Sequence, residues 1–466
     1  MTETPVEDPI EAVYPDLTDF FQASPLAYAG YRISELKKRG SDISEAGEVP
    51  FVTSPVFPVV LVGYVLLVRV KHLWTVVRGR DGIDPLPEGG HLFSMTSSHG
   101  YRTRSFLEVA EALQEEGEEV CLLCSPAAAD ERESWEKRGL PTTTHRRLHG
   151  QVGGVRLAMS VVSSAVLTAR LWTKPDTYRS LTALYQYYNF VLLEYLKRES
   201  LRELTVNDPR IHTFSAMPYL VASTTPRDRF AYQHGLQMPD SDRLLSLPFF
   251  APMHVFIWGE AWRERFAEAL HSESTVHVVG SPWYDYLASR RSDRDPGTDV
   301  LFIGGSHGVS DPEVVTAYER LVGNTVETCE RNGYSLAVKL HPLESPAWYE
   351  ERGWGEYVAE FDDIDEALLE ARVSVTNGST AFVESAVLGV PAIVGDLFEN
   401  GLADLGPVDF VRFTGGPDFG GAIVEAVEGG EFRSEGSRPL IHLGESRDRI
   451  VDVVLGRRDR TIESTR

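Results

Sequence analysis

Two side chains that can carry positive charge follow one apolar run in the C-terminal half of the chain. In the run Val338-Lys-Leu-His-Pro342, Lys339 and His341 are two positions apart, so on a strand they point to the same face. Only seven of the 45 basic residues are lysines, and one of them stands here. A cationic pair at a strand end suits a phosphate leaving group, whose developing charge is stabilised by ~3 kcal/mol in a dry site. A surface lysine beside a structural histidine is the alternative.

A second candidate site lies at residues 375–393, where a strand, a loop, a helix and a further strand are expected in succession. Ser379 and Thr380 follow Gly378 at the expected helix start, where backbone N–H groups and the helix dipole favour an anion. Glu384 comes about one helical turn later, which places it within reach of the paired hydroxyls of a ribose. A capped helix is the alternative, because Ser and Thr favour that position in any case.

Glycines end a third apolar run. Gly304, Gly305 and Ser306 follow the expected strand at 299–303, and glycine lets backbone N–H groups approach a phosphate closely. The spacing is not that of a dinucleotide-binding loop, and no lysine follows as in a Walker motif. A plain tight turn explains these residues equally well.

Two histidines in the N-terminal half are candidates for acid–base chemistry. His99 lies in the loop 97–104 between a strand and its helix, and His234 ends a strand just before Gly235. An imidazole has a pKa near neutrality, so either residue could serve as general base or general acid. A structural role for each histidine is the alternative.

No metal site is expected. Cys121 and Cys124 have the spacing of a zinc or redox pair, but they stand in an apolar run that is typical of a buried strand, where residues three apart point to opposite faces. Three cysteines cannot form a disulfide framework, which fits a reducing compartment. The Asp-x-Asp pairs in the chain are what so acidic a composition gives by chance.

The net charge excludes one class of function and suggests an environment. A formal charge of −24 argues against a nucleic-acid partner, because phosphate neutralisation needs a surplus of Lys and Arg. An acidic chain with few lysines is also typical of a halophilic cytoplasm, where salt screens self-repulsion. An ordinary acidic protein is the alternative.

The N-terminal 90 residues contain an apolar segment at 52–74. Its uncharged core, 56–68, is too short to span a bilayer and is followed by Arg69, Lys71 and a tryptophan. We expect peripheral contact with the inner face of the membrane through this segment. A helix buried in the protein is the alternative. The first twenty residues do not resemble a signal peptide, so a cytoplasmic location is expected.

From residue 91 onward, apolar runs alternate with amphipathic runs, which predicts the α/β class with parallel sheets. The charged segment at 291–298 divides this pattern into an N-terminal domain at 91–290 and a C-terminal domain at 299–455, with a polar tail at 456–466. We expect two Rossmann-like domains facing each other across a cleft, with ligands at the carboxyl ends of the strands. The expected strands are 91–96, 119–124, 211–214, 230–232, 255–258, 276–279, 299–303, 335–340, 373–376 and 391–394, and the helices are 105–116, 152–172, 178–199, 312–331, 363–371 and 380–388.

Several of these motifs, in the same order, resemble those of one superfamily. They are Tyr232-Gln-His-Gly235, Val278-Val-Gly-Ser-Pro-Trp-Tyr-Asp285, Lys339-Leu-His-Pro342, Ser379-Thr380 with Glu384, and Gly389-Val-Pro391. The chain is similar over roughly residues 91–455 to GT-B transferases of surface polysaccharides, a group that includes capsule-type glycosyltransferases and CDP-glycerol glycerophosphotransferases.

This resemblance implies roles for individual residues. His341 would contact the donor phosphates, Ser379 and Thr380 would hold the distal phosphate, Glu384 would bind ribose, and His234 would lie near the reacting groups. The fold generally needs no tightly bound metal, and no cofactor is expected beyond the nucleotide-activated donor.

The activity implied is transfer of a sugar from a nucleotide-activated donor to a glycan or lipid-linked acceptor. His99 or His234 would deprotonate the acceptor hydroxyl. The alternatives are a polyol-phosphate transferase of the CDP-glycerol type, a nucleotide-sugar epimerase, and a non-catalytic partner subunit at the membrane.

Overall fold

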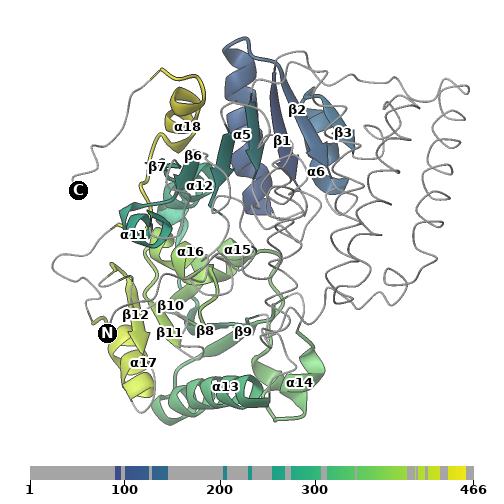
Figure 1. The fold of residues 1–466 in the computed structure, drawn as a ribbon. Coiled ribbons are helices and arrows are strands. Elements are labelled where there is room, and N and C mark those ends of the chain that lie inside the picture. Colours follow the sequence, from purple (N-terminus) through teal and green to yellow (C-terminus); the bar gives the residue numbers. More distant parts are fainter. Residues whose placement is uncertain are drawn as a thin grey trace, which may run out of the picture. The chain divides into compact units, whose positions relative to one another are not determined.

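The computed structural model describes residues 90–95, 100–124, 129–144, 203–206, 229–233, 254–267, 274–305, 312–341, 344–395, 405, 408–414, 418–430 and 439–457. They form two sheets with covering helices (Figure 1). Some expectations lie outside these residues: the apolar segment at 52–74, the helices at 152–172 and 178–199, the strand at 211–214, and His99, His234 and Ser306.

The first sheet has seven strands in the order β3-β2-β1-β4-β5-β6-β7 within the described ranges. The strands are β1 (His91–Met95), β2 (Val120–Cys124), β3 (Thr142–Thr144), β4 (Glu203–Val206), β5 (Arg229–Tyr232), β6 (His254–Ile257) and β7 (Thr275–Val278). The pairs from β3 across to β5 are parallel. Helices α5 (Gly100–Glu115) and α6 (Ala129–Lys137) follow β1 and β2. Cys121 and Cys124 are buried within β2, as the apolar run predicted, and neither forms a disulfide within the described residues.

The second sheet is parallel throughout, with the order β12-β11-β10-β8-β9. Its strands are β8 (Thr298–Ile303), β9 (Leu336–Lys339), β10 (Ala371–Thr376), β11 (Ala392–Gly395) and β12 (Val411–Thr414). Its covering helices are α13 (Pro312–Asn332), α15 (Ile364–Leu369), α16 (Ala381–Leu388) and α17 (Phe419–Val427).

Side-chain alternation decides which helices cover which face of this sheet. Phe302 and Val375 point to one face and form a single core with apolar residues of α13 and α17. Helices α15 and α16 contact β10 separately from this core, and Ser374 on the other face of β10 donates a hydrogen bond to Ser385 of α16 at 2.9 Å. The sheet is therefore covered on both sides, which explains its nearly continuous apolar strands.

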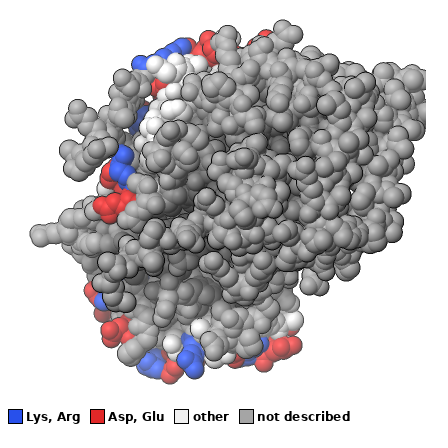
Figure 2. Space-filling view, in the orientation of Figure 1, with Lys and Arg blue, Asp and Glu red and all other residues white. Residues whose placement is uncertain are grey.

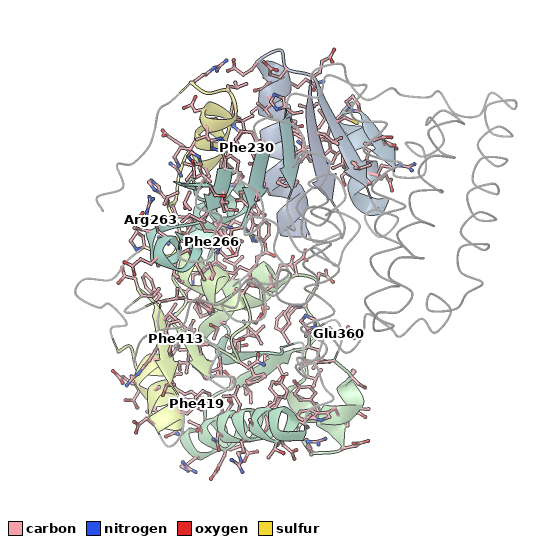
Figure 3. The ribbon with its side chains drawn as sticks, in the orientation of Figure 1. Phe230, Arg263, Phe266, Glu360, Phe413 and Phe419 are labelled. Carbon is pink, nitrogen blue, oxygen red and sulfur yellow. The ribbon has the colours of Figure 1, made fainter. Side chains whose placement is uncertain are left out.

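The outer end of the second sheet is closed by aromatic side chains, two of which are labelled in Figure 3. Phe413 on β12 meets Phe382 of α16 edge to face, with ring centroids 5.7 Å apart. Phe419 at the start of α17 is buried in the core on the α13 side. The edge strand β12 is thereby held by both helix layers.

The described residues fall into two compact units. The first holds residues up to 233 together with 254–255 and 274–275, and the second holds 256–267 and 276–457. This division falls within β6 and β7, whereas the charge pattern placed it at 291–298. The domain limits inferred from the sequence remain a prediction.

The charged segment at 291–298 is bonded into the second unit through its arginines. Arg290 pairs with Asp365, and Arg291 donates to the carbonyl of Val387. Arg294 donates to the carbonyls of Gly389 and Ala371 at 2.7 and 3.1 Å. The absence of apolar residues in this segment indicated a linker, but guanidinium groups can satisfy buried carbonyls at helix and strand ends in place of apolar packing.

The C-terminal residues 439–457, including α18 (Ser446–Val454), pack against the region around α12 (Pro282–Ser289). Asp285 accepts hydrogen bonds from the backbone N–H groups of Gly444 and Ser446 at 2.5 and 2.8 Å. The guanidinium of Arg449 donates to the carbonyl of Val279 at 2.9 Å. Gly280 lies between these contacts with a φ of 81°.

The sequence placed most of the described strands correctly. The expected strands that fall on described residues correspond to β1, β2 and β5 to β11 with ends that differ by at most two residues. The strands β3 (TTT), β4 (ELTV) and β12 (VRFT) were not predicted, because each contains at most two apolar residues and so lacks the apolar run that indicates a buried strand. The predicted α/β class with parallel sheets is confirmed.

Acidic and basic side chains are interspersed on the described surface. In Figure 2, red and blue residues alternate along the lower rim, where α13 lies, and neither colour forms a broad patch there. Within α13, Arg331 pairs with Glu327 one turn away. Among the helices in the described ranges, none has both the length and the apolar character that crossing a bilayer requires.

Replacing Gly280 with Ala should strongly destabilise the second unit. The new Cβ would collide with the carbonyl oxygen of His442 and the hydroxyl of Ser446, and the positive φ is itself unfavourable for alanine. We expect a loss on the order of 3 kcal/mol in the free energy of unfolding, measured by denaturant titration. Gly297→Ala is the matched control, because no atom lies within 4 Å of a Cβ built there. Equal stability of the two variants would contradict this account.

Candidate functional site

Three of the sequence motifs leave the second sheet at the same edge. β8 lies between β9 and β10, and Ile303 at its end is in register with Lys339 on one side and Thr376 on the other. The segments that begin at Gly304, Leu340 and Asn377 therefore start side by side at the carboxyl edge of the sheet. In parallel α/β sheets this edge is where ligands bind.

The two glycines after β8 are required by neighbouring protein atoms. A Cβ on Gly304 would overlap the carboxylate of Glu344, and a Cβ on Gly305 would overlap the side-chain amide of Asn377. The backbone N–H of Gly304 donates to the carbonyl of Lys339 at 2.9 Å. The glycines thus allow the strand ends to pack closely. Their expected contact with a phosphate remains a prediction.

His341 is held by a reciprocal pair of hydrogen bonds with Glu344. The backbone N–H of His341 donates to Oε2 of Glu344 at 2.8 Å, and the backbone N–H of Glu344 donates to the carbonyl of His341, also at 2.8 Å. The His341 residue is half-buried. This pair closes the turn after β9 and fixes the backbone from which the imidazole extends.

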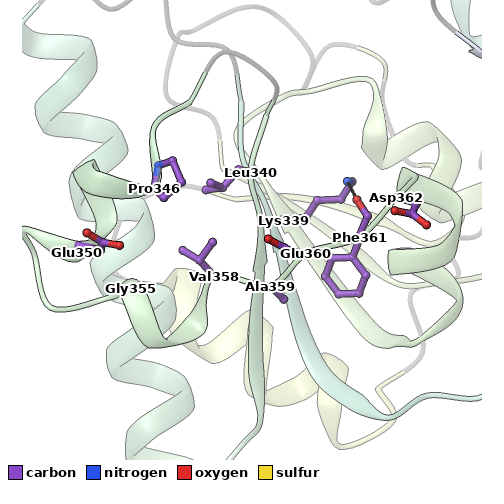
Figure 4. A pocket seen from close by; sticks show the side chains of 10 residues that line it. All are labelled: Lys339, Leu340, Pro346, Glu350, Gly355, Val358, Ala359, Glu360, Phe361 and Asp362. Carbon is purple, nitrogen blue, oxygen red and sulfur yellow. Dashed lines mark hydrogen bonds between the residues drawn. The ribbon is translucent and has the colours of Figure 1, made fainter.

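Lys339 faces a cavity beside the edge strand β9 (Figure 4). Its ammonium donates to the carbonyl of Phe361 at 3.1 Å and lies 6.0 Å from the centre of that ring. The cavity has a volume of about 600 Å³, and three carboxylates, Glu350, Glu360 and Asp362, contribute to its lining. Whether Lys339 acts on a phosphate together with His341 remains a prediction.

The start of α16 presents donors that an anion could use. Gly378 has a φ of 93°, and Thr380 adopts a helical conformation at the N-cap. Within the described residues, the backbone N–H groups of Gly378, Ser379 and Thr380 make no hydrogen bond, and all three residues are partly exposed. The backbone N–H of Ala381 donates to the hydroxyl of Ser379 at 3.4 Å, a long distance that makes this a weak cap. Free N–H groups at a helix start favour an anion.

Glu384 lies in a helix of which every residue is buried. Its side chain is beside α12 and α15, since α16 contacts both helices. The pKa of Glu384 is raised to about 7, chiefly by burial and also by the nearby Asp365, while the indole of Trp283 partly offsets this rise. The carboxyl group is therefore about half protonated near pH 7 and largely protonated below about pH 6. Its expected contact with ribose remains a prediction.

Sequence reasoning missed three residues at this edge. Glu344 and Asn377 pack against the glycines, and the hydroxyl of Thr376 is buried at the end of β10 without a hydrogen-bond partner in the part of the chain described. The signal for Asn377 and Thr376 was their position at a strand end. Nothing in the spacing indicated Glu344, because its role depends on the side chain folding back toward β8.

The candidate catalytic histidines, His99 and His234, lie outside the described residues. Their proposed roles are therefore untested. Among the described residues, no group of three or more His, Cys, Asp or Glu side chains could hold a metal ion.

Solved structures with the same architecture identify the fold. UDP-GlcNAc 2-epimerase from Neisseria meningitidis, bound to UDP-GlcNAc, aligns with a TM-score of 0.51 at 12% identity over 78% of this chain and 100% of its own. MurG from Acinetobacter baumannii aligns at 0.43 with 15% identity, over 79% and 99% of the two chains. The wall teichoic acid polymerase TagF aligns at 0.39 with 10% identity, over 84% and 98%. The sequence matches no protein-family model and no curated protein.

The chain therefore has a GT-B fold, with two Rossmann-like α/β units. The resemblance inferred from the motifs is confirmed at the level of the fold. At these identities the comparison shows the architecture and leaves the substrate open.

Replacing Glu384 with Gln should remove a pH-dependent loss of stability. Because the folded pKa of Glu384 is raised to about 7 from 4.5, the native state binds this proton more tightly than the unfolded chain. The stabilisation is complete below the unfolded pKa and is lost as pH rises to about 7, by ~3 kcal/mol in total. Gln resembles the neutral acid, so the variant should equal wild type near pH 4.5 and exceed it at pH 8.

The measurement is urea unfolding of both proteins from pH 4.5 to pH 8 at constant salt. Trp283→Phe provides a second variant, since loss of the indole donor should raise the pKa of Glu384 further and deepen the loss of stability. A constant difference between Glu384→Gln and wild type across this range would contradict the buried, protonated carboxyl.

Proposed function

We propose that this protein is a glycosyltransferase that moves a sugar from a nucleotide-activated donor to a glycan or lipid-linked acceptor in surface carbohydrate assembly. The second unit would bind the donor, and the first would bind the acceptor. The observation that carries this proposal is the register of β8, β9 and β10, which brings three candidate donor-binding segments to one sheet edge.

In this proposal, the α16 start binds the distal phosphate through the N–H groups and hydroxyls of Ser379 and Thr380. His341 contacts the phosphate nearer the nucleoside, and Gly304 and Gly305 permit close approach of the backbone. Two supports for this assignment are the N–H groups at the α16 start, which have no hydrogen-bond partner among the described residues, and the fixed turn at His341. Such donors stabilise the charge that develops on a leaving nucleotide.

Glu384 would bind ribose hydroxyls as a neutral or ionised carboxyl, depending on pH. A protonated carboxyl can both donate and accept a hydrogen bond, which suits a pair of vicinal hydroxyls. The raised pKa of Glu384 supports this role, because the group is about half protonated near pH 7 and can gain or lose the proton there.

The acceptor side of the proposal rests on the sequence. His99 or His234 would remove the proton from the acceptor hydroxyl, and no metal ion is required. The apolar segment at 52–74 would contact the inner membrane face, which suits a lipid-linked acceptor in the cytoplasm.

A nucleotide-sugar epimerase is the second candidate. The Neisseria meningitidis structure of similar fold is a UDP-GlcNAc 2-epimerase bound to UDP-GlcNAc. That structure supports a nucleotide sugar as the ligand to test, and it makes epimerisation the rival reaction. A polyol-phosphate transferase remains a narrower variant of the transferase proposal, and a non-catalytic partner subunit is the alternative that needs no nucleotide.

The first test is nucleotide binding. We expect CMP, CDP, UDP or GDP to raise the melting temperature of the protein in high salt, because a ligand that binds only the native state stabilises it. His341→Ala should raise the Kd of the tightest-binding nucleotide at least tenfold, measured by calorimetry, since it removes a contact to phosphate. His277→Ala, a half-buried histidine on β7, is the matched control and should bind as wild type. A non-catalytic subunit would bind none of the four nucleotides.

The second test separates transfer from epimerisation. A transferase given the matching nucleotide sugar should release free nucleotide in proportion to added acceptor. An epimerase would instead return an altered nucleotide sugar, with the same result whether or not an acceptor is present. Chromatography of the nucleotide products distinguishes the two, and an acceptor-independent change of the sugar would overturn the transferase assignment.

A further inference from the structure

We propose that Glu344 is a positioning residue that holds the backbone of His341 and the Gly304 loop in the geometry that binds donor phosphates. This inference rests on the proposed function, because it assigns a role within the same phosphate site. Glu344 itself need not touch the donor. Its role is to fix how the turn at His341 and the Gly304 loop pack against each other beyond the last hydrogen bond between β8 and β9.

Both oxygens of the Glu344 carboxylate accept a hydrogen bond. Oε2 accepts the backbone N–H of His341 at 2.8 Å, and Oε1 accepts the hydroxyl of Tyr318 at 2.7 Å. Tyr318 is buried on α13, the helix that underlies β8. The turn after β9 is therefore tied through one carboxylate to the helix beneath the sheet.

A second tyrosine completes this connection. The hydroxyls of Tyr318 and Tyr349 are 2.8 Å apart, and because Tyr318 gives its only proton to Glu344, Tyr349 must be the donor between them. Burial raises the pKa of both phenols, so both keep their protons. Tyr349 belongs to α14 (Pro346–Glu350), which directly follows the turn.

The same carboxylate also limits the loop after β8. A Cβ on Gly304 would overlap Glu344 Oε2, so Glu344 packs directly against the backbone of Gly304. The position of Gly304 is thus set by a group that also fixes His341. One side chain determines the separation of two of the three segments that form the proposed phosphate site.

Because Glu344 carries a negative charge, the direction in which nucleotide affinity changes on its removal tests the proposal. A carboxylate near a phosphate site repels a nucleoside diphosphate, so removing it should tighten binding if charge were its only effect. If Glu344 positions the site, the same removal should weaken binding, because the backbone N–H of His341 and the hydroxyl of Tyr318 lose their acceptor. The two roles predict opposite changes in affinity.

The experiment compares nucleotide affinity in wild type, Glu344→Ala, Tyr318→Phe and Glu330→Ala by calorimetry with UDP, CDP and GDP. Glu330→Ala is the matched control, because Glu330 also accepts a tyrosine hydroxyl, from Tyr357 at 2.8 Å, but lies on α13 away from the strand ends. We expect Kd to rise at least tenfold in Glu344→Ala and about threefold in Tyr318→Phe, which keeps the ring and the carboxylate. Glu330→Ala should stay within twofold of wild type.

A double variant adds a readout that simple destabilisation would not give. Gly304→Ala should weaken binding mainly by displacing the Glu344 carboxylate, so the double variant with Glu344→Ala should lose less affinity than the two single losses added together. Independent effects would add instead. Melting temperatures of all variants separate loss of fold from loss of affinity.

Unchanged or tighter binding in a folded Glu344→Ala variant would overturn the positioning role. If that variant is unfolded, Tyr318→Phe decides, and wild-type affinity there would also overturn it. An equal loss of affinity in Glu330→Ala would show that removing any glutamate–tyrosine hydrogen bond on α13 weakens binding. That result would refute a specific role for Glu344. If wild type binds none of the nucleotides, the proposed function itself fails, and this inference fails with it.

Discussion

The parallel register of β8 with its two neighbours is the constraint on which the rest of the second unit depends. Because Ile303 is level with both Lys339 and Thr376, three loops must leave the sheet at one edge within the width of three strands. There is little room between them, and the side chains of Glu344 and Asn377 occupy it. Gly304 and Gly305 follow from this crowding, since a larger residue would force the strand ends apart.

Buried polar groups, more than apolar packing, fix the details of this edge. Glu344 accepts hydrogen bonds from the turn at His341 and from Tyr318 of α13, and it packs against the Gly304 loop. A network of this kind is directional, so it specifies one arrangement where apolar contacts alone would allow several. The partly exposed N–H groups at the start of α16 differ from this network, because no hydrogen bond satisfies them within the described part of the chain.

Arginine performs a related task at the start of the second sheet. Arg294 satisfies two carbonyls at the ends of α16 and β10, and Arg290 pairs with the buried Asp365 near Glu384. Several donors in a rigid plane allow one guanidinium to reach more than one acceptor. In a chain with few lysines, this property explains how a strongly charged and largely exposed segment is bonded to the second unit through its arginine side chains.

The sequence by itself determined the elements, their class and the position of each motif. Apolar runs separated by amphipathic runs predict a parallel α/β sheet. Lys339 and His341 were placed at a strand end and Ser379 at a helix start because that pattern is local. The same local pattern cannot reveal strands as short as β3 or the arginine contacts of 290–294, which depend on partners some 75 to 96 residues away in the chain. Only the tertiary structure decided that Gly304 meets Glu344, that Lys339 donates to Phe361, and that Glu384 is buried enough to raise its pKa to about 7. Strand order sets these contacts, and strand order is a property of the whole sheet that no short stretch of sequence contains.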